Sequence, residues 1–234
     1  MCIRDSGAAL VAPQKGAIFW TRCEFDIEVT SALFDQIKHN FPLLRAWYTT
    51  NLTASNPLLV SIPLGLNDYC GYTAFHKIAG NLEHFQRSDV LHPREGVLCC
   101  MNPNTHLTSR LAVLENAKKR SDVLVVQPDT TLTGFKRYLH LLRTSDFVLC
   151  PRGNGIDTHR FWEALYMGCI PISLRQDLLA CHVSMPMLVL DSWSQLADVN
   201  LKTASEAIRS KQWDLRPLCI DYWVDTAINT LTSP

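Results

Sequence analysis

The segment from Phe147 to Leu174 constrains the fold of this chain more than any other. An apolar run leads into a loop with two glycines, and a helix-like stretch follows with Arg160 and Glu163 in its first two turns. Asp157 or Thr158 caps this helix, and a second apolar run comes after it. The order strand, glycine loop, helix, strand predicts a parallel α/β unit. The N-terminus of its helix presents unpaired N–H groups and a partial positive charge, which favours binding of a phosphate or diphosphate.

Charged side chains of the same segment suit such an anion. Arg152 and Arg160 carry forked donors that phosphate oxygens accept in pairs, and the Glu163 carboxylate can accept from both hydroxyls of a ribose. The alternative is that Arg160 and Glu163, three residues apart, only pair with each other on a solvated helix face. The loop glycines beside Arg152 favour the anion site. The ligand-binding residues predicted in this segment are Arg152, Gly153, Asn154, Gly155, Asp157, Arg160 and Glu163.

From residue 96 onward, strand-like and helix-like stretches alternate, which predicts a Rossmann-type parallel sheet covered by helices. Continuous apolar runs such as 123–126 predict strands that are buried on both faces. Ligands of such sheets bind at the carboxyl ends of the strands, where this chain has Asn102, 152–157 and Asp191. The expected strands are 97–101, 123–127, 147–150, 170–174 and 187–190, and the expected helices are 108–119, 132–143 and 158–167.

The chain before residue 96 is less regular. It predicts a helix over 31–40 and strands over 17–20, 43–48 and 58–62. The domains expected from these patterns are a partial N-terminal α/β domain at 7–95, a ligand-binding domain at 96–212 and a C-terminal segment at 213–234. Apolar residues at helical spacing predict that 213–231 forms one amphipathic helix.

Composition excludes several classes of function. A hydrophobic share of 47%, a charged share of 19% and a formal net charge of zero describe a globular chain with no electrostatic preference for nucleic acid. No apolar run approaches the roughly 18 residues of a membrane span. The chain has nine cysteines but no Cys-x-x-Cys pair, so buried reduced thiols are expected and a structural metal is not.

At this point the chain resembles a known family. The run around the glycine loop resembles the donor-site signature of exostosin-like (family 47-type) glycosyltransferases, which are inverting sugar transferases with the GT-B fold. The residues that carry the resemblance are Arg160, Glu163-Ala164-Leu165 and Gly168-Cys169-Ile170-Pro171, with further matches at Asn102-Pro103-Asn104-Thr105, Arg110 and 187–193. Fucosyltransferase-like families have a related helix followed by Gly-x-x-Pro.

The resemblance implies an α/β chain of the GT-B type, with an N-terminally truncated first domain and a last helix that crosses back to it. It implies transfer of a sugar from a UDP- or GDP-linked donor to a hydroxyl of a glycan or glycoprotein acceptor. It also implies that Glu163 binds the donor ribose, and it adds Asn102 and Arg110 to the donor-binding residues. For Arg110 the alternative is an ordinary surface arginine. The nucleotide sugar is a substrate, so no further cofactor is expected.

The mechanism expected from the resemblance is inverting and independent of a metal. Retaining GT-B enzymes commonly carry an acid eight residues before the ribose-binding glutamate, and this chain has Gly155 there. The chain also lacks the Asp-x-Asp pair that usually holds a metal diphosphate. Inversion requires a general base, and the candidates are Asp26, Asp68, Glu28 and His76. No motif places any of them, and the alternative for each is a solvated surface residue or a turn or cap residue.

Two other interpretations stay open. The chain can be a catalytically inactive nucleotide- or sugar-binding domain, or a fragment of a larger glycosyltransferase. A nicotinamide-dependent oxidoreductase also uses a glycine loop on a parallel sheet, but the loop 153–155 lacks the third glycine and follows a late strand. No targeting signal is visible, so the location stays open between the cytoplasm and, if a preceding segment carries an anchor, the Golgi.

Overall fold

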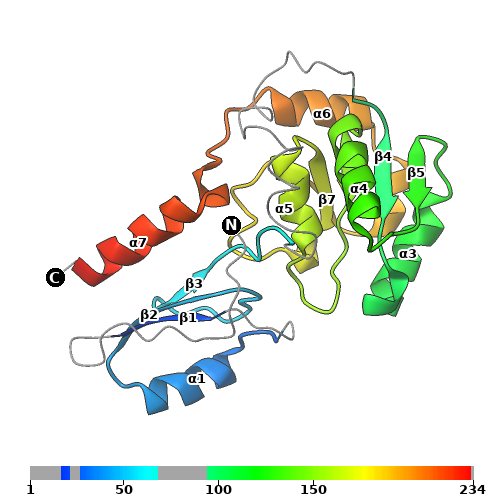
Figure 1. The fold of residues 1–234 in the computed structure, drawn as a ribbon. Coiled ribbons are helices and arrows are strands. Elements are labelled where there is room, and N and C mark those ends of the chain that lie inside the picture. Colours follow the sequence, from blue (N-terminus) through cyan, green and yellow to red (C-terminus); the bar gives the residue numbers. More distant parts are fainter. Residues whose placement is uncertain (1–16, 22–26, 68–93, 233–234) are drawn as a thin grey trace.

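The computed structural model describes residues 17–21, 27–67 and 94–232. Within them the strands form two separate parallel sheets, and helices lie against both (Figure 1). The first sheet has the order β1-β2-β3 and the second has the order β5-β4-β6-β7-β8. The strands are β1 (Ala17–Thr21), β2 (Leu44–Thr49), β3 (Leu59–Ser61), β4 (Val97–Cys100), β5 (Val123–Val126), β6 (Phe147–Leu149), β7 (Ile170–Leu174) and β8 (Leu188–Leu190).

The helices connect these strands. They are α1 (Ser31–Asn40), α3 (Leu107–Ala117), α4 (Leu132–Thr144), α5 (His159–Tyr166), α6 (Leu201–Arg209) and α7 (Ile220–Thr232), with short 3₁₀ turns at 103–105, 175–177, 193–197 and 216–218. None of the helices in the described residues is long and apolar enough to cross a membrane. The predicted α/β class with a Rossmann-type parallel sheet is confirmed.

The core of the larger sheet explains why its central strands form where they do. Every residue of β4, β6 and β7 is buried, and α5 packs on them through Phe161, Trp162 and Leu165. Helix α5 ends at Tyr166, and Gly168 follows shortly after it with a φ of +72°, the left-handed conformation that glycine adopts without strain. The chain can therefore turn at once into β7.

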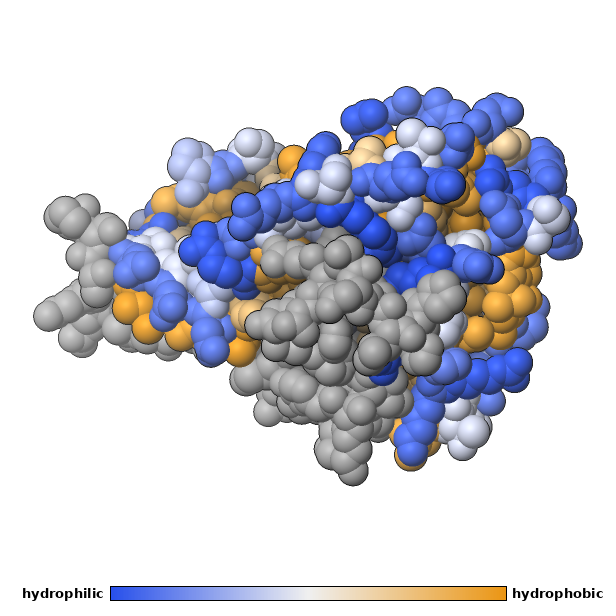
Figure 2. Space-filling view, turned by 90° about the horizontal axis from the view of Figure 1, so that it is seen from above, coloured by the Kyte–Doolittle hydropathy of each residue, from blue (hydrophilic) through white to orange (hydrophobic). Residues whose placement is uncertain are grey.

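Strand β5 differs from its prediction. Its apolar run suggested burial on both faces, yet Leu124 is 50% and Val125 is 40% exposed. The reason is the strand order, which puts β5 at the edge of the sheet with β4 as its one neighbour. In Figure 2, seen from above, an apolar area lies at the side of the molecule that carries β5.

The C-terminal helix is shorter than predicted. It begins at Ile220 and not at Trp213, because Pro217 lies in a 3₁₀ turn and a proline disfavours helical conformation in the residue before it. Helix α7 packs on the first sheet, where Trp223 and Ala227 contact the cluster of Ala46, Tyr48 and Ile62. A last helix that returns to the N-terminal part was expected; the domain boundaries themselves stay predictions.

Candidate functional site

The carboxyl ends of β4, β5 and β6 open into a pocket with a volume of about 450 Å³. After β4 the chain proceeds to β5 on one side, whereas β6 lies on the other side of β4. This reversal of strand order is the place where open α/β sheets bind their ligands. The polar residues that line the pocket are Asn67, Thr105, Arg110, Asp129, Thr130, Tyr138, Asn154, Asp157, Thr158, His159, Arg160 and Glu163.

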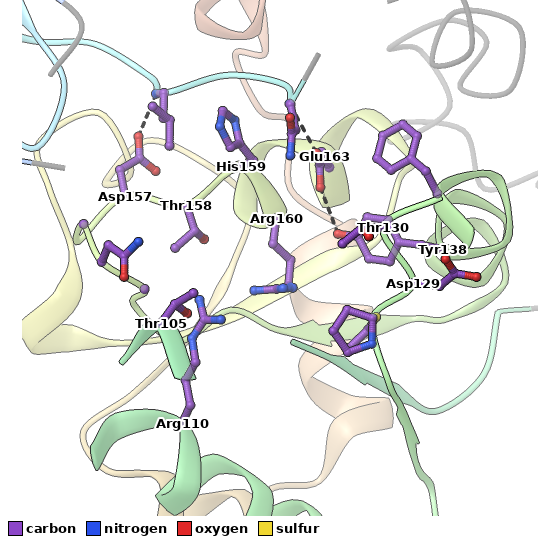
Figure 3. A pocket seen from close by; sticks show the side chains of 18 residues that line it. Thr105, Arg110, Asp129, Thr130, Tyr138, Asp157, Thr158, His159, Arg160 and Glu163 are labelled. Carbon is purple, nitrogen blue, oxygen red and sulfur yellow. Dashed lines mark hydrogen bonds between the residues drawn. The ribbon is translucent and has the colours of Figure 1, made fainter. Parts of the chain in front are cut away.

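Two guanidinium groups face each other in this pocket. Arg110 from α3 and Arg160 from α5 extend toward one another (Figure 3), and neither forms an ion pair within the described part of the chain. Burial, together with the positive charge of Arg160, lowers the pKa of the Arg110 guanidinium to about 10. The buried Nε of Arg160 has no hydrogen-bond partner among the described residues. The Glu163 carboxylate attracts Arg160 electrostatically, but it is a single negative charge beside two cations, so the pair favours a further anion.

Arg110 is held in place by backbone oxygens. Its Nε donates to the carbonyl of Arg152 at 3.0 Å, and its Nη1 donates to the carbonyl of Asn102 at 2.7 Å. Its third nitrogen, Nη2, lies against the glycine loop, where a Cβ placed on Gly153 would come within 2.8 Å of it. Arg110 is thus a buried residue of the site and not the surface arginine of the alternative interpretation.

Glu163 is in the second turn of α5. It lies on the side of Arg160 that faces away from Arg110 (Figure 3). Its Oε2 accepts a hydrogen bond from the Tyr138 hydroxyl at 3.0 Å, and its Oε1 accepts one from the backbone N–H of Asn67 at 3.3 Å. Burial is the main reason that the pKa of Tyr138 lies well above its usual value, so this hydroxyl remains a donor. The carboxylate is 4% exposed and keeps further lone pairs for a ligand.

A short segment of the N-terminal part, residues 64–67, crosses this end of α5; we call it the strap. The Leu64 N–H donates to Asp157 Oδ2 at 2.7 Å, and the Gly65 carbonyl accepts from His159 Nδ1 at 2.7 Å. With the bond from Asn67 to Glu163, three backbone groups of the strap bind side chains of the glycine loop and α5, and Figure 3 marks the bonds to Asp157 and Glu163. The strap therefore closes one wall of the pocket.

Asp157 is the centre of this attachment. Its Oδ1 accepts from Trp162 Nε1 at 2.7 Å and from His182 Nε2 at 3.0 Å, and its backbone N–H donates to Asn51 Oδ1 at 2.9 Å. Together with Leu64, these bonds occupy both carboxylate oxygens. A side-chain cap on α5 was predicted from Asp157 or Thr158. Thr158 is the N-cap residue, but its side chain makes no capping bond.

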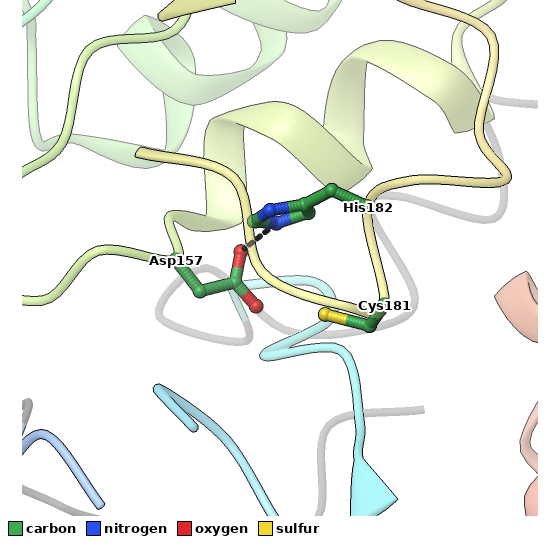
Figure 4. A group of neighbouring side chains, drawn as sticks. All are labelled: Asp157, Cys181 and His182. Carbon is green, nitrogen blue, oxygen red and sulfur yellow. Dashed lines mark hydrogen bonds and ion pairs between the residues drawn. The ribbon is translucent and has the colours of Figure 1, made fainter. Parts of the chain in front are cut away.

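The ligand atoms of Asp157, Cys181 and His182 lie within 4.8 Å of one another (Figure 4). The Leu179 N–H donates to His182 Nδ1 at 3.0 Å, so the proton of the neutral ring is on Nε2, which donates to Asp157. Both ring nitrogens are therefore engaged within the chain. Burial raises the pKa of the Cys181 thiol well above its usual value, which leaves it a poor metal ligand.

A protein-family model described as the RXYLT1 C-terminal domain matches residues 98–224, more than half of the chain. The chain belongs to this family. The RXYLT1 C-terminal domain family is glycosyltransferase-like, and the matched region contains both pocket arginines and Glu163 but not the strap. The narrower exostosin-like assignment stays a prediction.

The chain was also compared with solved structures. A structure titled "Crystal Structure of alpha1,3-Fucosyltransferase" matches with a TM-score of 0.47 and 15% sequence identity, covering 82% of this chain and 68% of that one. No curated protein sequence matched the chain.

Seven of the nine predicted donor-binding residues line this one pocket. They are Gly153, Asn154, Gly155, Asp157, Arg160, Glu163 and Arg110. Asn102 is exposed and does not line the pocket; its carbonyl holds Arg110, and its side chain caps the turn at 103–105.

Arg152 also lies outside the pocket lining. Its Nη2 donates to Glu28 Oε1 at 2.9 Å, so the side chain turns toward the N-terminal part and not toward the predicted anion. The same ion pair engages Glu28, one of the base candidates. Three other base candidates, Asp26, Asp68 and His76, lie outside the described residues.

Sequence reasoning missed several residues that line the pocket. Tyr138 comes from α4 and Thr105 from the turn after β4, and both are far from the glycine loop in the sequence. His159 precedes Arg160 in the sequence, but its bond to the Gly65 carbonyl of the strap could be seen only in the structure. One signal was available, because 102–105 and 128–130 follow expected strands at the same edge of the sheet.

Proposed function

We propose that this chain binds a nucleoside diphosphate sugar, UDP- or GDP-linked, and transfers the sugar to a hydroxyl of a glycan or glycoprotein acceptor. The observation that carries the proposal is the unpaired couple of Arg110 and Arg160 at the carboxyl edge of the sheet. A diphosphate would form the ion pairs that neither arginine makes within the described part of the chain.

The proposed roles follow from charge and position. In the transition state, negative charge grows on the leaving diphosphate, and two preorganised guanidiniums stabilise it. This is the service that a metal ion performs in other sugar transferases, which supports a mechanism without a metal. The Glu163 carboxylate, held by Tyr138, is proposed to accept from the ribose hydroxyls on the far side of Arg160.

We propose inversion at the transferred carbon. It is supported by Gly155, which supplies no carboxylate at the position where retaining enzymes commonly carry one. Direct displacement then requires one base that removes the proton of the acceptor hydroxyl.

A calorimetric titration with UDP, GDP and NAD tests the donor site. We expect one nucleoside diphosphate to bind, and Arg160→Ala to weaken it by about 10- to 150-fold, because a hydrogen bond to a charged group contributes about 1.5–3 kcal/mol. Arg175→Ala is the matched control, since Arg175 is an exposed arginine outside the pocket that pairs with Asp191. Equal affinity of the two variants would refute the proposed site.

Turnover decides between the proposal and an inactive binding domain. The wild-type chain is incubated with UDP- and GDP-sugars, with and without simple glycoside acceptors, and release of the nucleoside diphosphate is measured. Binding without any release would favour the catalytically inactive alternative. Binding of NAD in preference to both nucleoside diphosphates would favour the oxidoreductase.

A further inference from the structure

His159 is the first residue of α5, and its ring lines the pocket. Its Nδ1 lies 2.7 Å from the carbonyl oxygen of Gly65. A carbonyl only accepts hydrogen bonds, so Nδ1 carries the ring proton and donates. The neutral ring then has its lone pair on Nε2, and this atom has no hydrogen-bond partner among the described residues.

The strap fixes this orientation of the ring. Gly65 has a φ of +76°, a left-handed conformation that glycine adopts without strain, and this turns its carbonyl toward His159. The strap is fastened on either side of Gly65, by Leu64 to Asp157 and by Asn67 to Glu163. The tautomer and direction of His159 are therefore set by bonds that do not involve a ligand.

Figure 3 shows the His159 ring between Asp157 and Glu163 on the strap side of the pocket, whereas the guanidinium of Arg160 extends the other way, toward Arg110. The free nitrogen of the ring thus belongs to the pocket that contains the arginine couple. An inverting transfer needs its proton acceptor across the transferred carbon from the leaving diphosphate, because the acceptor hydroxyl attacks from the side opposite the bond that breaks.

The other titratable groups of the pocket are less suited to accept a proton. Both oxygens of Asp157 already accept hydrogen bonds within the chain, and Glu163 accepts from Tyr138 and Asn67. Hydrogen bonds from Thr131, first from its backbone N–H, lower the pKa of Asp129, which makes that carboxylate a weak base.

The thiol and phenol groups of the pocket and the earlier candidate Glu28 are also excluded. Burial raises the pKa values of Cys100 and Tyr138, so both remain protonated. Glu28 is paired with Arg152 outside the pocket lining.

We propose that His159 Nε2 is the general base of the transfer reaction. Nε2 takes the proton of the acceptor hydroxyl, and the acceptor oxygen forms a bond to the anomeric carbon of the donor sugar. The bond from that carbon to the diphosphate oxygen breaks, and its electron pair leaves on the diphosphate, beside Arg110 and Arg160. The imidazolium then returns the proton to solvent. This assignment rests on the proposed function.

The test compares two substitutions at this position. His159→Ala removes both ring nitrogens, whereas His159→Asn retains a donor for the Gly65 carbonyl and removes only the base. Each protein is mixed with the UDP- or GDP-sugar and the simple glycoside acceptor that the wild-type chain turns over fastest, and release of the nucleoside diphosphate is measured with and without added imidazole. Calorimetry gives the affinity for the free nucleoside diphosphate, and the melting temperature reports on folding.

We expect both variants to lose about 10²- to 10⁴-fold in turnover rate, the usual contribution of a general base, with nucleotide affinity within threefold of wild type. Added imidazole restores part of the rate in His159→Ala, because it occupies the space of the ring and accepts the proton. A merely structural role of His159 predicts no rescue.

The outcomes separate the base assignment from the proposed function. Wild-type turnover in His159→Asn, or a loss in His159→Ala that imidazole does not restore, overturns the assignment of the base alone. A folded wild-type chain that binds no nucleoside diphosphate overturns the proposed function, and the base assignment with it.

Discussion

Asp157→Asn tests whether this residue fastens the strap, as its bonds indicate, or binds the donor, as its place in the sequence suggested. Its carboxylate is 1% exposed and accepts from the Leu64 N–H, the Trp162 indole and the His182 ring. Asparagine keeps the shape but replaces one oxygen by an NH₂ donor. An NH₂ in the place of Oδ1 would face two other donors, the Trp162 indole and the His182 ring. The NH₂ therefore takes the place of Oδ2, where it faces the Leu64 N–H.

The expected destabilisation follows from these three bonds. The bond to Leu64 is lost, at about 2 kcal/mol for a charge-assisted bond, and the remaining two become neutral bonds that are each weaker by about 1 kcal/mol. The sum is about 4 kcal/mol, which lowers the melting temperature of a domain of this size by about 8–16 °C.

Differential scanning calorimetry measures this shift, with Asp198→Asn as the control because Asp198 is exposed and forms no side-chain hydrogen bond to any described residue. If Asp157 fastens the strap, the affinity for the nucleoside diphosphate changes less than threefold. A melting temperature within 2 °C of wild type, or a tenfold loss of affinity in a protein of unchanged stability, would refute this reasoning.

Three further outcomes are expected. Gly153→Ala weakens the binding of pyrophosphate about fivefold by isothermal calorimetry, since the new Cβ would lie 2.8 Å from Arg110 Nη2 and displace a buried donor; an equal affinity would contradict this contact. Pyrophosphate at about 100 times its dissociation constant stabilises the wild-type chain by about 2.7 kcal/mol, and the thermal shift disappears in Arg110→Ala. Burial raises the pKa of Cys150 to about 12 and raises that of Cys219 less, so peptide mapping after iodoacetamide treatment at pH 8.5 labels Cys219 before Cys150.

Much of the larger sheet could be predicted because its signals are local. The predicted strand 170–174 and the predicted helix 31–40 have the same bounds as β7 and α1 in the structure. The helix α6 was missed because only Leu201 and Ile208 are apolar among its buried residues, and the third is Ser205. A capping signal was present, since Asn200 accepts from the Thr203 N–H at 3.1 Å.

The site was predicted in part for the same reason. The glycine loop and the start of α5 are adjacent in the sequence, so Arg160 and Glu163 could be assigned to one site from their spacing. Arg152 is equally close in the sequence, but its direction depends on Glu28, which is 124 positions away. Tyr138 could not be found either, because nothing near it in the sequence shows that its hydroxyl meets Glu163.

Residues from the N-terminal part of the chain and from region 98–224 both contribute to this pocket. Region 98–224, which matches the family model, contains the arginine couple and Glu163, so the residues proposed to bind a diphosphate lie within it. The tautomer of His159, by contrast, is set by the carbonyl of Gly65, which lies outside that region. If the proposed roles hold, the diphosphate is bound by residues of 98–224, whereas the proposed base is positioned by a residue outside that region. Gly65→Ala separates the two roles, because it strains the strap at a φ of +76° and is expected to slow turnover more than it weakens nucleotide binding.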